Sequence, residues 1–260
     1  MNLENTDKIT DEKEYVTGHI ESFWIFSKTI LYTFGICVKV IMVKFIDKNQ
    51  YRQVMDRILK CWGCNLMRIL DTQIELKGKE HFKLEPGRAH MIMCSHTSNY
   101  DIPATFASLD GSIRMLAKKE LKNIPFFGKA MQRIEMVFID RQNKANAISD
   151  LNAAKRVMED GIVLWVAPEG TRTIGAKKLG KLKKGGFHLA VSTDAIIIPI
   201  GFRGINDLQL RERYAWHKHR TIECHIGKPI DSKNFPVTKI NNLLVEVRQS
   251  LETLIGVNEV

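Results

Sequence analysis

From Thr72 onward, short apolar runs alternate with helical stretches, and this alternation constrains the fold more than any other feature of the sequence. The runs that predict strands are Ile74–Leu76, Met91–Cys94, Ile113–Ala117, Met136–Ile139, Ile162–Ala167, Ala195–Ile200 and Thr221–Ile226. Helical stretches fit between several of them, most clearly Asn146–Glu159 before Gly161. The pattern predicts an α/β fold, with a sheet covered by helices, in a single domain over residues 73–260.

The segment before this domain has a different character. Residues 1–14 are polar, lack a signal-peptide pattern and predict a flexible tail. Residues 15–46 are rich in aromatic and aliphatic side chains, but the longest charge-free run, Thr29–Val38, is shorter than the ~20 residues of a plain transmembrane helix. On one helix Glu21, Lys28 and Lys39 would share a narrow arc. We predict a helix or helical hairpin lying in a membrane interface; an amphipathic helix packed on its own domain is the alternative.

Apolar side chains at helical spacing predict a second helix over residues 50–70, so that residues 15–72 form an N-terminal helical segment. This helix contains Cys61 and Cys64 at CxxC spacing. Without a preceding strand, a second CxxC or a histidine pair, two half-buried thiols are a better interpretation than a redox or zinc site. Five cysteines in 260 residues also argue against a secreted disulfide scaffold and favour a cytosol-facing protein.

The chain carries 39 lysines and arginines against 29 acids, a net charge of +10. Such an excess indicates an anionic partner: nucleic acid, a lipid headgroup surface or an acidic substrate.

Three polar or charged clusters follow directly after predicted strands. They are Ser95–Asp101, Asp140–Arg141 and Pro168–Arg172. Ligands of open α/β sheets bind at the carboxyl ends of the strands, so parallel strands would bring the three clusters to one site.

His96 and Asp101 are five residues apart and would diverge on a continuous helix. A turn from a loop into a helix could bring them together, and Pro103 is tolerated in a first helical turn. The carboxylate would then orient the imidazole as a general base for an alcohol. The alternative is that Asp101 only caps the next helix and His96 is an ordinary loop residue.

Basic residues near these clusters suit an anion. Lys118, Arg141 and Arg172 have this character, and Gly170 allows close backbone approach; solvated surface charges are the alternative. A denser basic strip consists of lysines 177, 178, 181, 183 and 184, and it suits headgroups, an acidic donor or solvent alike.

Several other site types are disfavoured by the sequence. Gly175–Lys181 has P-loop spacing, but Leu182 replaces the Ser or Thr that reaches magnesium, which argues against an NTPase. The chain has no GxSxG, HExxH or Cys/His zinc pattern. Cys94 should be buried at a strand end, which argues against it as a nucleophile beside His96.

Taken together, the blocks resemble the glycerolipid acyltransferases, most closely the 1-acylglycerol-3-phosphate acyltransferases. The matching blocks, in order, are HTSNYD at 96–101, AKKEL to IPFFG at 117–128, FIDR at 138–141, PEGTR at 168–172 and IIPIGFRG around Pro199. Each block alone is weak or modest, whereas their order and spacing are specific. Ser95 stands where the family often has asparagine, a variant that we expect to be tolerated.

The resemblance implies a mixed, mostly parallel sheet covered by helices, of the glycerolphosphate-acyltransferase-like kind, with an N-terminal helical segment that docks on a membrane. It implies that His96, oriented by Asp101, deprotonates the sn-2 hydroxyl of lysophosphatidate, which then attacks the thioester of acyl-CoA or acyl carrier protein. Lys118, Arg141 and Arg172 would hold the acceptor phosphate.

Glu169, Gly170 and Thr171 belong by the same resemblance to a substrate-binding motif, in which Glu169 either contacts the acceptor or supports the loop. No metal or organic cofactor is implied. The expected location is the cytoplasmic face of the cell membrane, with an interfacial or monotopic attachment.

Two alternatives remain at this point. One is acyl transfer to another acceptor, such as glycerol 3-phosphate, a lysophospholipid or a lyso-ornithine lipid. The other is a basic module that binds nucleic acid or anionic membrane without catalysis. Because charge is a less specific signal than ordered motifs, we expect no nucleic-acid partner.

Overall fold

The computed structural model describes residues 15–43, 47–140, 144–173, 179–210 and 214–257. Within them, eight strands form one sheet in the order β2-β10-β7-β3-β6-β4-β5, with β11 also paired to β7. The strands are β2 (Gln73–Lys77), β3 (His90–Cys94), β4 (Ile113–Lys118), β5 (Val137–Ile139), β6 (Val163–Val166), β7 (Ile196–Arg203), β10 (Thr221–Ile226) and β11 (Ile230–Asp231).

The sheet is mixed and mostly parallel, as the family resemblance implied. Strands β7, β3, β6, β4 and β5 run parallel, β10 and β11 run antiparallel to β7, and β2 is parallel to β10. The seven strands predicted from the sequence all lie in this sheet. The two-residue strand β11 was not predicted, because two residues are too few to show an alternation.

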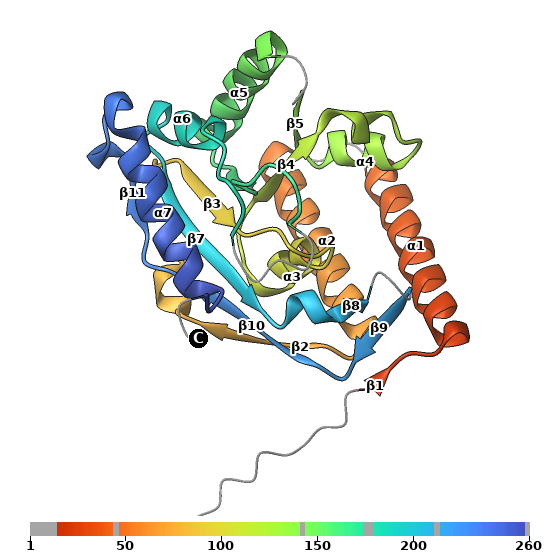
Figure 1. Ribbon diagram of the computed structural model, residues 1–260. Coiled ribbons are helices and arrows are strands. Elements are labelled where there is room, and N and C mark those ends of the chain that lie inside the picture. The colour runs from red at the N-terminus through yellow and green to blue at the C-terminus, as the bar shows by residue number, and fades with distance from the viewer. Residues whose placement is uncertain (1–14, 44–46, 141–143, 174–178, 211–213, 258–260) are drawn as a thin grey trace, which may run out of the picture.

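Helices cover both faces of the sheet (Figure 1). They are α1 (His19–Met42), α2 (Lys48–Ile69), α3 (Asp101–Ser108), α4 (Phe127–Arg133), α5 (Lys144–Glu159), α6 (Gly185–Ser192) and α7 (Ile240–Leu254). Short 3-10 turns are η1 (Lys79–His81), η2 (Lys119–Asn123), η3 (Ile205–Leu208), η5 (Ser232–Asn234) and η6 (Val237–Lys239).

Strand β3 shows why its sequence is apolar throughout. Ile92 and Cys94 belong to the core shared with α2 and α3, whereas Met91 and Met93 belong to the core under α5, α6 and α7. Successive residues of a strand point to opposite faces, so a strand covered on both sides needs apolar residues at every position.

Helix α1 is continuous over 24 residues, so residues 19–42 form a single helix rather than a hairpin. It packs on α2 and α4 and buries Ser22, Ile25, Cys37 and Val40. Much of its remaining surface is apolar and exposed. Among the described residues, α1 is the one helix long and apolar enough to cross a membrane by length and composition.

A small antiparallel sheet holds the start of α1. It contains β1 (Tyr15–Val16), β9 (Ala215–Lys218) and β8 (Gln209–Leu210), with β9 in the middle. The Thr17 amide donates to the carbonyl of Trp216 at 2.9 Å, and the Thr17 hydroxyl accepts from the Trp216 amide at 2.9 Å. The beginning of α1 and the segment after η3 are therefore attached to the same strand.

Candidate active site

The HTSNYD segment leaves the carboxyl end of β3 and turns into α3. Asp101 is the first residue of α3, and the turn brings its carboxylate back to His96. The distance from His96 Nδ1 to Asp101 Oδ2 is 2.8 Å. The structure therefore contains the loop-to-helix turn that the His96–Asp101 contact requires.

Asp101 does not cap α3. The N-cap position belongs to Tyr100, and Asp101 Oδ2 instead accepts from the backbone amides of Thr97 at 2.8 Å and Ser98 at 2.9 Å. A carboxylate can only accept hydrogen bonds, so His96 Nδ1 carries the proton that is donated to Asp101. His96 Nε2 is thereby left as the nitrogen that can accept a proton.

Two buried neighbours complete the surroundings of His96. The indole of Trp165 in β6 meets the imidazole edge to face, with ring centroids 5.7 Å apart and planes at 88°. Cys94 is fully buried, and this burial raises the pKa of its thiol well above the ordinary range. With its thiolate disfavoured, Cys94 is unsuited to act as a nucleophile beside His96.

Glu169, the acidic residue of the PEGTR loop, is buried. The residue is 4% exposed, and its carboxylate accepts from the His96 amide at 3.2 Å, the Gly180 amide at 2.8 Å and the Thr173 hydroxyl. The Thr173 amide in turn donates to the His96 carbonyl at 2.9 Å. These contacts favour support of the loop, one of the two roles that the sequence left open for Glu169.

The rest of the PEGTR loop reaches the site surface. Gly170, Thr171 and Arg172 line the same cavity as His96 and Lys118. Gly170 has φ +74°, a conformation that favours glycine. The predicted anion ligand Arg141 lies outside the described residues, as do lysines 177 and 178 of the basic strip.

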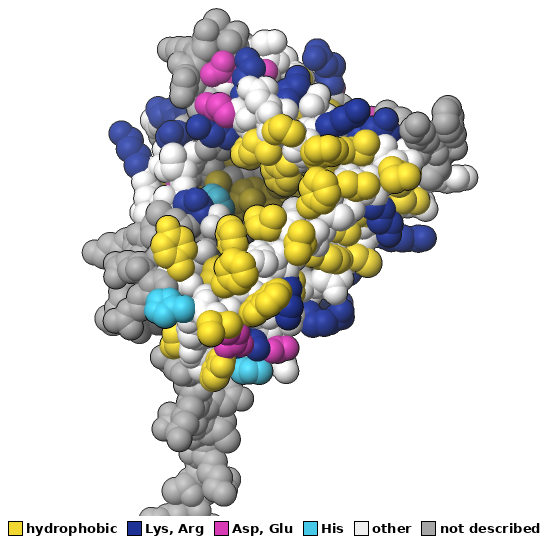
Figure 2. Space-filling view, turned by 90° about the vertical axis from the view of Figure 1, so that its right-hand side faces the viewer, with side chains coloured by type: hydrophobic (Ala, Val, Ile, Leu, Met, Phe, Trp, Pro, Cys, Tyr) yellow, Lys and Arg dark blue, Asp and Glu magenta, His cyan; other side chains and the backbone are white. Residues whose placement is uncertain are grey.

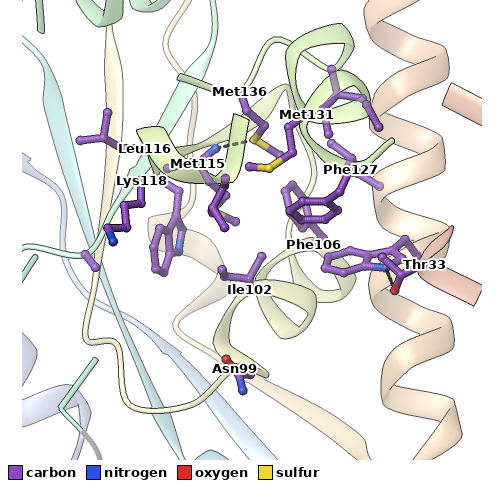
Figure 3. Close-up of a pocket in the computed structure, with 18 of the residues that line it drawn as sticks. Thr33, Asn99, Ile102, Phe106, Met115, Leu116, Lys118, Phe127, Met131 and Met136 are labelled. Atoms are coloured by element: carbon purple, nitrogen blue, oxygen red, sulfur yellow. Dashed lines mark hydrogen bonds between the residues drawn. The ribbon is translucent and has the colours of Figure 1, made fainter. Parts of the chain in front are cut away.

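An apolar cavity of about 480 Å³ opens beside His96. Its walls come from α1, α2, α3, α4 and strands of the sheet with the segments beside them, and they include Ile102, Phe106, Phe127, Met131 and Met136 (Figure 3). Lys118 lies on one side of this space and Thr33 of α1 on the other. The cavity thus combines the cationic side chains of Lys118 and Arg172 with a largely apolar lining.

The surface around α1 is strongly apolar. Figure 2 shows hydrophobic side chains gathered on this side of the molecule around a hollow. Those of α1 include Ile20, Phe23, Trp24, Phe26, Ile30, Leu31 and Phe34, all about half exposed or more. Phe126, beside α4, extends the surface and meets Phe34 with ring centroids 5.3 Å apart. Contiguous exposed apolar surface of this kind marks a contact with a membrane or a partner.

The cysteines and possible metal ligands add little to the site. Cys61 is exposed and Cys64 is half-buried, so the expectation of two half-buried thiols is met only by Cys64. In the part of the chain that the structure describes, no cluster of three or more His, Cys, Asp or Glu could hold a metal ion.

Sequence reasoning missed some residues of the site. From the sequence, Trp165 was predicted only as an apolar strand residue. No sequence pattern indicated that Trp165, or Thr33 and Cys37 of α1, line the cavity. Asn99 lies inside the HTSNYD block, where its contact with Arg172 could not be foreseen.

The fold matches that of a solved structure, the 1-acyl-sn-glycerophosphate (LPA) acyltransferase PlsC from Thermotoga maritima. The TM-score is 0.69 at 22% identity, covering 88% of this chain and 91% of that one. The Acyltransferase family model matches residues 73–203, half of the chain. This chain belongs to the acyltransferase family.

Two relatives agree with this assignment. An uncharacterised acyltransferase of Schizosaccharomyces pombe is 31% identical over 185 residues, which cover 70% of this chain and 65% of that protein. A 1-acyl-sn-glycerol-3-phosphate acyltransferase of Helicobacter pylori is 30% identical over 190 residues, which cover 71% and 73%. The matched part is therefore just under two thirds of the S. pombe protein.

Proposed function

We propose that this chain transfers a fatty acyl group from a thioester donor to the sn-2 hydroxyl of 1-acylglycerol 3-phosphate, which yields phosphatidic acid. The observation that carries the proposal is the His96–Asp101 pair at the mouth of an apolar cavity that also has Lys118 and Arg172 at its surface. A base, an apolar interior and cations together match a substrate with a hydroxyl, an acyl chain and a phosphate. The name of the H. pylori relative supports the same acceptor.

The His96–Asp101 contact supports the following proton transfers. His96 Nε2 removes the proton from the acceptor hydroxyl, while Asp101 stabilises the imidazolium that forms. The alkoxide attacks the thioester carbonyl carbon directly, and the tetrahedral intermediate collapses as the carbon–sulfur bond breaks. The proton held by His96 then passes to the departing thiolate, so that an ester and a free thiol leave the site. No acyl-enzyme intermediate is needed.

Lys118 and Arg172 hold the acceptor phosphate in this proposal, with Arg141 assisting. Arginine's planar fork suits a phosphate, and Lys118 presents an ammonium at the same cavity. Lys118 also lies 3.2 Å from Glu120, so the phosphate competes with that carboxylate for the ammonium. Arg172→Ala is expected to raise the KM for the acceptor more than it lowers kcat.

The apolar surface of α1 docks the enzyme on the cytoplasmic face of the cell membrane, with the helix lying in the interface. This surface surrounds the hollow seen in Figure 2. The phosphate of a lipid acceptor lies at the level of the headgroups. Lys28 and Lys39 of α1 are exposed and can contact anionic headgroups at that level. Acyl-CoA and acyl carrier protein are both anionic donors that suit the net charge of +10.

The decisive experiment measures CoA release from oleoyl-CoA by the purified protein in detergent, with and without lysophosphatidate. We expect release that requires the acceptor and that disappears in folded His96→Ala. Release without the acceptor, or full activity of His96→Ala, would contradict the proposal.

The same assay separates the alternative substrates. Release with glycerol 3-phosphate, a lysophospholipid or a lyso-ornithine lipid, but not with lysophosphatidate, would reassign the acceptor. Acyl transfer from acylated acyl carrier protein, with none from oleoyl-CoA, would identify the carrier protein as the donor. No activity with any pair, combined with salt-sensitive binding to nucleic acid, would favour the basic binding module.

A further inference from the structure

A relay of two side-chain hydrogen bonds joins Arg172 to the small sheet. Asn99 Oδ1 accepts from Arg172 Nη1, and Asn99 Nδ2 donates to Gln209 Oε1 at 3.2 Å. Asn99 follows β3, Arg172 follows β6 and Gln209 begins β8, so the relay joins three segments that are distant in sequence. No sequence pattern had drawn attention to Gln209.

The backbone of Gln209 is firmly held. Ile205 and Leu208, just before it, are fully buried, and Gln209 itself pairs with Trp216 of β9. Trp216 is 4% exposed, and both its backbone amide and its carbonyl form hydrogen bonds with Thr17. Gln209 therefore presents its amide from a fixed position, whereas Asn99 is an exposed loop residue.

The relay requires one orientation of the Asn99 amide. A guanidinium has only donors, so Asn99 must turn its oxygen to Arg172 and its NH2 group away. An acceptor at residue 209 stabilises this orientation, since the Oε1 of Gln209 takes the hydrogen of the Asn99 NH2 group. A donor at residue 209 would instead attract the Asn99 oxygen and turn the NH2 group toward the guanidinium.

We infer that Gln209 is a positioning residue that acts through Asn99 to hold the Arg172 guanidinium ready for the acceptor's phosphate. The inference rests on the proposed function, because it takes Arg172 as a phosphate ligand. Arginine has a long side chain with many rotamers, and ordering it before the substrate arrives lowers the cost of binding.

The test compares Gln209→Glu, Gln209→Met and Gln209→Lys by acceptor-dependent CoA release. Glutamate keeps an acceptor, methionine removes it and lysine replaces it with a donor. We expect Gln209→Met and Gln209→Lys to raise the KM for lysophosphatidate about threefold to tenfold, as for one lost hydrogen bond, with lysine the worse. Gln209→Glu should stay within about twofold of the wild type in KM, and all three should keep kcat and the KM for the donor.

The signs of these effects separate positioning from simple charge. A new lysine near a phosphate site would by charge alone tighten anion binding, and a new glutamate would weaken it. Positioning through Asn99 predicts the opposite: Gln209→Lys raises the KM for the acceptor, and Gln209→Glu leaves it nearly unchanged. Gln249→Lys adds the same charge at an exposed position of α7 and serves as the matched control, with no expected change in either KM.

A double-mutant cycle with Arg172→Ala completes the test. Without the guanidinium, Gln209→Lys should cause no further rise in the acceptor KM. Three outcomes would overturn the inference but not the proposed function. They are a KM for the acceptor that follows the charge at residue 209, unchanged KM values in an active enzyme, and an equal rise of the acceptor KM with and without Arg172. A wild-type protein with no lysophosphatidate-dependent release would instead overturn the proposed function, and the inference with it.

Discussion

Replacing Asp101 by asparagine would separate the charge of this buried carboxylate from its shape. The three hydrogen bonds that Asp101 accepts, from His96, Thr97 and Ser98, all end on the same oxygen, Oδ2. The other oxygen, Oδ1, is buried and has no hydrogen-bond partner among the described residues. An asparagine whose carbonyl takes the place of Oδ2 can therefore keep the turn and the orientation of His96.

The expected magnitude follows from the geometry. When His96 accepts a proton, its charge lies about 4 Å from the Asp101 carboxylate, a pair worth about 4 kcal/mol at an effective dielectric constant near 20. Asp101 is fully buried and the His96 side chain is 16% exposed, so solvent screens the pair only weakly. Loss of this interaction should lower kcat about 10³-fold. Folding stability should change by only about 1 kcal/mol, because the backbone amides keep an acceptor.

The assay is CoA release at saturating lysophosphatidate, combined with urea unfolding of the same variants. Asp110→Asn, in an exposed ion pair with Lys60, is the matched control and should keep full activity. Asp101→Asn activity within threefold of the wild type, with unchanged stability, would refute the electrostatic role of Asp101. If Asp101→Ala lost stability but no activity, Asp101 would serve only the turn.

Three further predictions concern the core, the membrane surface and pH. Arg114 is fully buried and lies 2.6 Å from Asp56, so Asp56→Ala should cost about 3 kcal/mol in urea unfolding; a loss below about 1 kcal/mol would contradict this. Leu31→Asp should weaken flotation with anionic vesicles about tenfold or more, whereas Val245→Asp on α7 should not; equal effects would argue against docking through α1. Burial lowers the pKa of His90, so the unfolded chain binds a proton first as pH falls below about 6.5. Stability should therefore fall from pH 7 to pH 5, and by less in His90→Gln; identical pH profiles would contradict that origin.

The sequence predicted the centre of the large sheet well because β3, β6 and β7 are buried on both faces. A strand such as β3, in which every residue is buried, is recorded locally as an unbroken apolar run. The small sheet was not predicted, because its strands are short and carry no comparable apolar run. Strand β8 has two residues, and its stability comes from pairing with β9 rather than from its own composition.

The candidate site divides in a similar way. The cluster after β3 could be read from residue types, and the turn that unites His96 with Asp101 is local enough to be inferred from their spacing. The role of Glu169 could not, since the amides that it binds belong to His96 and to Gly180 on either side in sequence. The cavity wall contributed by α1 was equally hidden, because it depends on how α1 packs against α4.

The sequence by itself determined the α/β class, the positions of the main strands along the chain and the identity of the polar clusters at their ends. These properties depend on patterns of neighbouring residues, which the chain carries wherever it folds. Only the tertiary structure decided that Glu169 faces inward, that α1 walls the cavity and that Gln209 reaches Arg172 through Asn99. Such contacts join residues far apart in the chain, and they exist only once packing has fixed the distances between elements.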